Sequence, residues 1–203
     1  MFENGGIILA SASPRRKELL RQVGIVAVVE PSHVEEKITS TAPDQVVMEL
    51  SRQKAEDVAA RHKGEPVVVI GSDTVVAVDG QILGKPKDAA DAVHMISMLA
   101  GRSHQVYTGV TLIACGANGQ PVWESRRVTF AEKTDVYVYP MTLRQIEAYV
   151  STGEPMDKAG AYGIQGMFAA YVKGISGDYN NVVGLPVGRV CRELMEGFGY
   201  EME

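Results

Sequence analysis

Residues 11–16, SASPRR in one-letter code, have the residue types of a phosphate-binding turn. The apolar residues 7–9 before them predict a buried strand, and the pattern after them predicts a helix. Ser13 is a favourable N-cap, and Pro14 suits the first helical position. Free amides and the positive end of the helix dipole would attract an anion there. The segment is therefore a candidate phosphate cradle.

Arg15 and Arg16 fall in the first turn of that predicted helix. Cations at this position oppose the helix dipole unless an anion joins them, and a polyphosphate would remove the conflict. The alternative is a capped surface helix with two solvated arginines, which the segment taken alone favours.

Lys54 lies on the apolar face of a helix predicted over residues 43–62. Its neighbours on that face, four residues apart, are Val46, Leu50 and Val58. The ammonium either reaches water from the edge of the stripe, which is the better explanation for an isolated lysine, or points into a cleft as a functional cation.

Asp73 interrupts an apolar strand predicted over residues 67–78. Burial of a carboxylate in such a run is costly unless it is paired, hydrated or bound to a metal. Because Val75 and Val76 resume the apolar run, we interpret Asp73 as functional rather than as the end of the strand.

Asp79 and Gly80 predict a tight hairpin turn. The resulting register places Lys85 opposite Thr74 and therefore close to Asp73. Lys85 is a candidate functional cation, and a solvated hairpin lysine is the alternative.

A regular ladder would point the side chains of Lys85 and Asp73 to opposite faces of the hairpin. We therefore predict a β-bulge near Gly71 or Gly84 that brings both into one pocket.

Glu35 and Glu36 lie in a polar loop predicted over residues 31–42. Most such pairs are solvated charge. If they meet Asp73, however, the carboxylates could hold Mg²⁺ beside a phosphate. The four histidines show no spacing typical of a zinc site.

The composition is that of an ordinary globular protein, with 203 residues, 45% hydrophobic residues and a net charge of −5. The negative charge argues against binding to a nucleic-acid polymer. Cys115 and Cys191 have no pairing or metal spacing, which suits a reducing compartment. With no signal peptide and no membrane-spanning stretch recognised, we expect a cytoplasmic protein without a membrane partner, folded as one domain over residues 1–203.

Alternating elements predict an α/β fold with a mixed sheet, because long hairpin strands argue against a purely parallel one. Residues 153–188 are rich in glycine and predict mostly loop with short elements. Strands are predicted over 7–9, 26–29, 67–78, 82–83, 105–115 and 122–138, with a turn over 116–119, and further helices over 88–100, 142–151 and 186–198.

The chain resembles the Maf family of nucleoside triphosphate pyrophosphatases, also called septum formation inhibitors, over about residues 7–192. The resemblance implies an elongated mixed sheet with flanking helices around a central cleft. It rests on six motifs in the family's order: SASPRR at 11–16, GSDT at 71–74, GKP at 84–86, YTG at 107–109, GEPMDKAGAYGIQG at 153–166 and VGLP at 183–186.

The resemblance implies hydrolysis of a nucleoside triphosphate to the monophosphate and pyrophosphate with a divalent metal, Mg²⁺ before Mn²⁺. Asp73 matches the family's proton acceptor, and Glu36 would help it hold the metal. The expected catalytic residues are Asp73, Glu36, Lys54 and Lys85, and the expected substrate-binding residues are Ser11, Ser13, Arg15, Arg16, Thr74 and Gln165.

Arg15, Thr74 and Gln165 match the family's dTTP/UTP subgroup, whereas its 7-methyl-GTP subgroup carries tryptophan, glutamine and glutamate there. Gln165 offers the donor and the acceptor that match the O4 and N3–H edge of uracil or thymine. The alternatives are a 7-methyl-GTP or ITP-type purine pyrophosphatase, and a non-catalytic nucleotide-binding regulator of cell division. Family members are often homodimers, so a homodimer is a further expectation.

Overall fold

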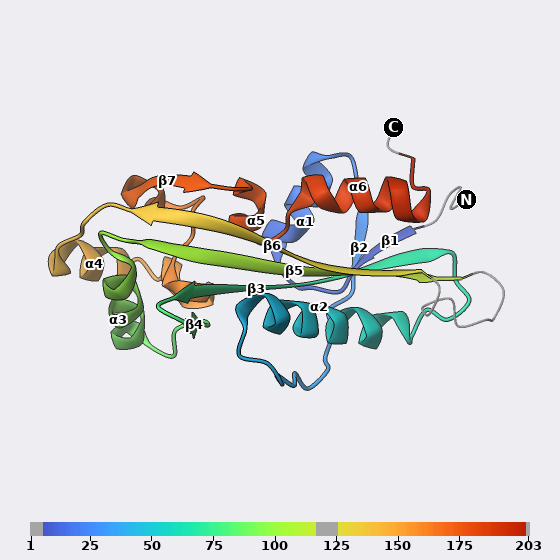
Figure 1. Cartoon of the computed structure of the whole chain (residues 1–203), viewed down its shortest axis with the longest axis horizontal. Helices are drawn as coiled ribbons and strands as arrows, with labels where there is room; N and C mark the ends of the chain where they lie inside the picture. Colours follow the sequence, from blue (N-terminus) through green and yellow to red (C-terminus); the bar gives the residue numbers. More distant parts are fainter. Residues whose placement is uncertain (1–5, 117–125, 202–203) are drawn as a thin grey trace. The chain divides into compact units, whose positions relative to one another are not determined.

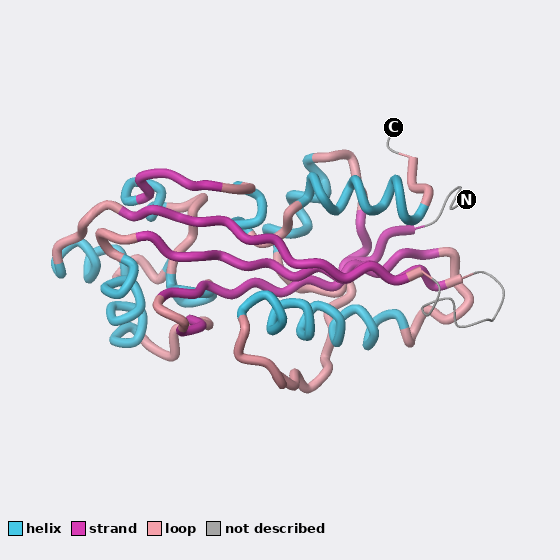
Figure 2. The backbone as a smooth tube through the Cα atoms, viewed as in Figure 1, coloured by secondary structure: helices cyan, strands magenta, loops and turns pink. Residues whose placement is uncertain are grey.

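Seven strands form one mixed sheet in the computed structural model, which describes residues 6–116 and 126–201 (Figure 2). The strand order is β2-β1-β3-β5-β6-β7, with β4 paired to β3. β1 runs parallel to β2 and β3, whereas β4 is antiparallel to β3 and β7 to β6, so the predicted mixed sheet is confirmed. The strands are β1 (Gly6–Leu9), β2 (Ala27–Val29), β3 (Val67–Val78), β4 (Gln81–Leu83), β5 (Ser103–Cys115), β6 (Arg127–Val138) and β7 (Val172–Ser176).

The predicted helices are present with slightly different ends, and the last one buries an apolar stripe of Val187, Val190, Cys191, Leu194 and Phe198. The turn predicted over 116–119 and the start of the strand predicted from 122 lie largely outside the described residues. The helices are α1 (Pro14–Gln22), α2 (Pro43–Ala59), α3 (Ala89–Leu99), α4 (Leu143–Val150), α5 (Tyr179–Val183) and α6 (Val187–Phe198), with 3-10 turns at η2 (Glu154–Asp157), η3 (Ala159–Ala161) and η4 (Met167–Tyr171).

The chain groups into two compact units. The first unit comprises Met1–Asp73, Thr108–Glu132 and Gly184–Glu203, and the second comprises Thr74–Tyr107 and Lys133–Val183. β3, β5 and β6 each contribute residues to both units. No helix among the described residues has the length and apolar character needed to cross a bilayer.

In the first unit, α2 packs closely against β3 and β5, while α6 lies across the strands from it (Figure 1). Two glycines allow this close approach. A Cβ on Gly71 would overlap the Ser51 carbonyl and Ala55, and one on Gly109 would overlap the Val47 carbonyl. The α2 backbone therefore lies nearly on the sheet.

The second unit has its own aromatic core. The buried Phe168 ring lies 5.1, 4.7 and 5.8 Å from the ring centroids of Tyr149, Tyr162 and Tyr171. Tyr162 also bonds the buried His104 through its hydroxyl, 2.7 Å from Nε2, and burial lowers the pKa of His104 to about 4. Much of this core comes from the glycine-rich region, where the predicted short elements are present, among them η4 and the five-residue strand β7.

The predicted hairpin turn is confirmed, because Asp79 and Gly80 both have positive φ, 50° and 75°. The β3–β4 ladder has the predicted register but ends at the pair Val76 and Leu83. Lys85 therefore lies beyond the ladder, and the ladder contains no bulge. The predicted bulge was wrong because β4 stops before the position where one would be needed.

Gly71→Ala should lower the free energy of unfolding by about 1–3 kcal/mol, because the new methyl group would push α2 off β3. Gly188→Ala in α6 is the matched control, since its Cβ would meet open space and alanine favours a helix. Urea unfolding of both variants measures the difference. Equal midpoints for the two would contradict the close packing of α2.

Candidate active site

The ammonium of Lys54 in α2 contacts two carboxylates. Its Nζ bonds Asp73 Oδ1 in β3 and lies 2.9 Å from Glu36 Oε1 in the loop before α2. The Lys54 and Asp73 side chains are only 17% and 16% exposed, whereas Glu36 is 45% exposed. The site therefore contains a largely buried ion pair with a second carboxylate at its open side.

The alternation of β3 places Asp73 opposite Lys54. Gly71 faces α2 at Ser51 and Ala55, and Asp73, two residues further along the strand, points to the same face. Lys54 precedes Ala55 on the helix and meets the carboxylate there. Of the two interpretations of Lys54, the structure supports the inward-pointing cation, because the ammonium is ion-paired rather than extended into water.

Arg16 in α1 joins three separate segments of the first unit. Its Nε donates to the Gly184 carbonyl at 2.8 Å, and its Nη1 donates to the Ser72 carbonyl and to Ser11 Oγ, both at 2.9 Å. Burial lowers the pKa of the Arg16 guanidinium, and the charge of Asp73 opposes that shift. Arg16 therefore braces the backbone around Asp73.

The start of α1 is partly as predicted. Pro14 occupies the first turn and Ser13 precedes the helix, but the Ser13 side chain makes no capping hydrogen bond. Instead the Ser13 amide donates to Ser11 Oγ at 3.3 Å. Ser13 is thus the N-cap residue by position, as predicted, but its side chain does not cap a first-turn amide. Arg15 is half-buried in the first turn.

The remaining candidates belong to the second unit. Thr74 is half-buried and follows Asp73 in β3, and Lys85 is exposed just after β4. Gln165 is exposed beside a turn closed by the Gly166 amide and the Gly163 carbonyl at 3.1 Å. The structure therefore brings together Lys54, Asp73 and Glu36, and separately Ser11, Ser13 and Arg16.

Sequence reasoning assigned no role to Ser72 or Gly184, whose carbonyls receive Arg16. The Ser72 hydroxyl also donates to the Gly184 carbonyl at 3.3 Å. Both residues lie in motifs that carry the family resemblance, GSDT and VGLP. Their position in those motifs was the available signal of a role. Residue type, however, does not show which backbone carbonyls act as acceptors.

Asp73 and Glu36 have the donor set that suits Mg²⁺, which usually takes one or two carboxylates together with substrate phosphates and water. Their contact with one ammonium shows that both carboxylates can reach a single cation. The described residues contain no cluster of three or more acidic, histidine or cysteine side chains suited to a metal. The pair thus fits a metal held jointly with substrate, not a closed protein cage.

Arg16→Ala should lower the free energy of unfolding by at least about 2 kcal/mol, because it leaves carbonyl acceptors without their charged donor. Arg21→Ala on the same helix is the control, since Arg21 pairs only with exposed Glu18 among its described contacts and should leave the urea midpoint nearly unchanged. If both variants unfold alike, Arg16 does not brace the site.

A family model described as Maf-like protein matches residues 6–197, which include both units. A relative named dTTP/UTP pyrophosphatase from Agathobacter rectalis is 56% identical over 93% of this chain and 95% of its own. Relatives with the same name from Koribacter versatilis and Carboxydothermus hydrogenoformans are 53% and 49% identical. These cover 93% and 96% of this chain, and 93% and 99% of their own. The chain therefore belongs to the Maf family.

Proposed function

We propose that this protein hydrolyses dTTP and UTP to the monophosphate and pyrophosphate. The observation that carries the proposal is the contact of Lys54 with Asp73 and Glu36, found in a Maf-family chain. The names of the relatives support the same substrates. A cation between two acids at one point provides both the positive charge and the basic oxygens that phosphoanhydride hydrolysis needs.

In the proposed reaction, a water oxygen attacks the α-phosphorus and the bond to the bridging oxygen breaks. Pyrophosphate leaves with that oxygen and its electron pair. Asp73 orients the water and accepts its proton. Lys54, adjacent to Asp73, then neutralises the charge that develops on the phosphate oxygens.

Asp73 and Glu36 would hold a divalent metal, and we propose Mg²⁺, with Mn²⁺ as a substitute. When bound, the ion would offset the negative charge of the triphosphate. Lys54 would remain beside the carboxylates, where its ammonium can exchange an acidic partner for a phosphate oxygen.

The resemblance assigns substrate binding to Arg15, Thr74 and Gln165, and a further catalytic cation to Lys85. Among these, Gln165 carries the pyrimidine preference, because its amide offers both a donor and an acceptor.

Within the second unit, Glu154 stabilises the turn beside Gln165. Glu154 accepts hydrogen bonds from the Tyr149 hydroxyl at 2.8 Å and the Met167 amide at 3.0 Å. The Gln165 side chain thereby extends from a well-supported turn, and is exposed to solvent.

We also propose that the protein acts in the cytoplasm on free nucleotides rather than on a nucleic-acid polymer. Association into a homodimer stays a prediction.

A panel of dTTP, UTP, ITP, 7-methyl-GTP and the common purine triphosphates, assayed with and without Mg²⁺, should show pyrophosphate release from dTTP and UTP only with the metal. Binding of nucleotide without pyrophosphate release would favour a regulator of cell division. A preference for ITP or 7-methyl-GTP would identify a purine enzyme instead.

Asp73→Asn should lower kcat by about 10²- to 10⁴-fold, because the amide cannot accept the proton. Lys54→Ala should lower kcat/KM by about 10²- to 10³-fold, as expected for a lost electrostatic donor. Asp44→Asn, half-buried in the first turn of α2, is the control and should keep normal turnover. Normal turnover of Asp73→Asn would refute this assignment.

Gln165→Glu should reduce kcat/KM for UTP by about 10- to 100-fold, because a carboxylate cannot donate to O4 of the base. The loss should be smaller for a guanine nucleotide, whose edge presents two donors. Gln145→Glu in α4 controls for the added charge. Equal losses for pyrimidine and guanine nucleotides would show that Gln165 does not read the base.

A further inference from the structure

Three side chains of α2, spaced four residues apart, hold the irregular segment that precedes the helix. Glu49, Gln53 and Asp57 lie along one helix face and accept hydrogen bonds from the backbone amides of Thr39, Lys37 and His33, respectively. The segment over residues 32–39 thus runs antiparallel to α2. These side-chain acceptors satisfy three backbone amides that have no sheet or helix partner.

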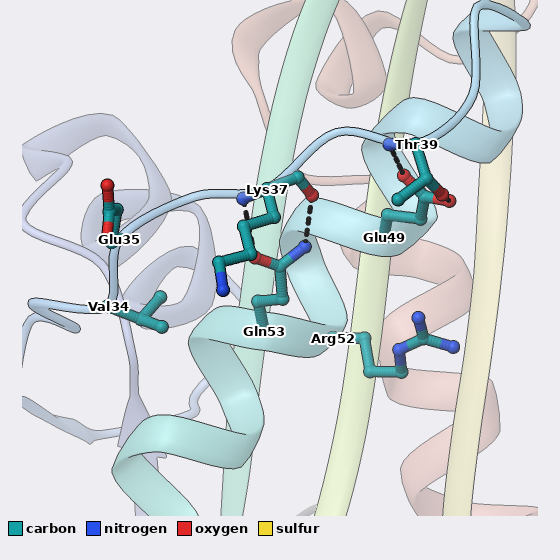
Figure 3. Close-up of a pocket in the computed structure, with 7 residues that line it drawn as sticks. All are labelled: Val34, Glu35, Lys37, Thr39, Glu49, Arg52 and Gln53. Atoms are coloured by element: carbon teal, nitrogen blue, oxygen red, sulfur yellow. Dashed lines mark hydrogen bonds between the residues drawn. The ribbon is translucent and has the colours of Figure 1, made fainter.

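The central contact, between Gln53 and Lys37, is reciprocal. The Lys37 amide donates to Gln53 Oε1 at 2.9 Å, while Gln53 Nε2 donates to the Lys37 carbonyl at 2.7 Å. Figure 3 shows these two bonds together with those from Thr39 to Glu49. A primary amide is the side chain that can satisfy both groups of one residue's backbone in this way.

We call the hydrogen bonds of Glu49, Gln53 and Asp57 to Thr39, Lys37 and His33 the clamp. Its register decides whether Glu35 or Glu36 reaches Lys54. Gln53 fixes Lys37, and the next helix residue, Lys54, meets the preceding loop residue, Glu36. Glu35, one position earlier, points away from Gln53 in Figure 3 and lines an open groove of about 430 Å³. The clamp therefore directs Glu36 toward Lys54 and leaves the adjacent Glu35 on the groove.

Among the described residues, Lys54 is the ion-pair partner of Glu36. Glu36 lies outside regular secondary structure, and its side chain is 45% exposed. The clamp is also open to solvent, because Lys37 and Thr39 are exposed and the groove runs between them and α2. Water can replace its hydrogen bonds at small net cost, so the clamp adds little to overall stability. Its effect should be confined to the position of Glu36.

We propose that Gln53 is a positioning residue that fixes the Lys37 peptide and thereby holds the Glu36 carboxylate beside Asp73 for a divalent cation. This inference rests on the proposed function, which assigns a divalent metal to Asp73 and Glu36. It adds that affinity for the cation depends on a side chain that contacts neither metal nor substrate.

The test compares Gln53→Ala with Gln45→Ala. The exposed Gln45 lies on the same helix, and its side chain bonds only Asp44 among the described contacts. In metal-free protein without nucleotide, Gln53→Ala should weaken Mn²⁺ binding, measured by calorimetry, by about tenfold or more. Amide hydrogen exchange at Lys37 should rise by about tenfold. Gln45→Ala should change neither, and the urea midpoints of both variants should stay close to that of the unaltered protein.

A second arm places Gln53→Ala in a Glu36→Gln background. Because Gln53 acts through Glu36, the double variant should bind Mn²⁺ and respond to Mg²⁺ in pyrophosphate release as Glu36→Gln alone does. An equal further loss in that background, or unchanged Mn²⁺ binding in Gln53→Ala, would overturn the inference. Failure of the unaltered protein to release pyrophosphate would instead overturn the proposed function, while the Mn²⁺ and exchange measurements would still test the clamp.

Discussion

One ammonium group lies between two carboxylates, and the surrounding structure serves to keep it there. Lys54 and Asp73 are mostly removed from water, and a buried charge without its partner is costly. Each of the two is therefore tolerated only because the other is close. Gly71 makes the contact possible, since a larger residue would hold α2 too far from β3. The contact between the ammonium and the Asp73 carboxylate thus depends on how closely α2 packs against β3.

The guanidinium of Arg16 is also a buried charge that needs partners, and it finds two of them in backbone carbonyls. It loses hydration on burial and gains three acceptors in return: Ser11 Oγ before α1, the Ser72 carbonyl in β3 and the Gly184 carbonyl before α6. Arg16 thereby braces the strand that carries Asp73, and the adjacent Arg15 is, like Arg16, half-buried at the start of the helix. The conflict between cations and the helix dipole, apparent in the sequence, is answered for Arg16 by carbonyl oxygens of the protein.

The features that sequence analysis predicted well are those with a strong local signal. The hairpin turn follows from the φ preferences of Asp79 and Gly80, and the buried stripe of α6 follows from helical periodicity. Lys54 and Asp73 were recognisable because each breaks an apolar pattern. Membership of the Maf family was recognisable from the motifs and their order, and the mixed sheet from the alternating elements and long hairpin strands.

The features that were missed depend on contacts distant in sequence. Short elements were predicted in the glycine-rich region, but not their packing around the Phe168 core, where Gly160 lies against Val76 too closely for a side chain. For Glu35 and Glu36, the family resemblance selected Glu36, but nothing in the local sequence shows why Glu36 is the one that meets Lys54.

The most direct test of the site is a crystal structure with Mn²⁺ and a dUTP analogue whose α–β bridge resists hydrolysis. Our account predicts anomalous density for Mn²⁺ coordinated by Asp73 and Glu36, with Lys54 Nζ within hydrogen-bond distance of a phosphate oxygen. Metal and triphosphate bound elsewhere, with Lys54 still between its two carboxylates, would contradict it.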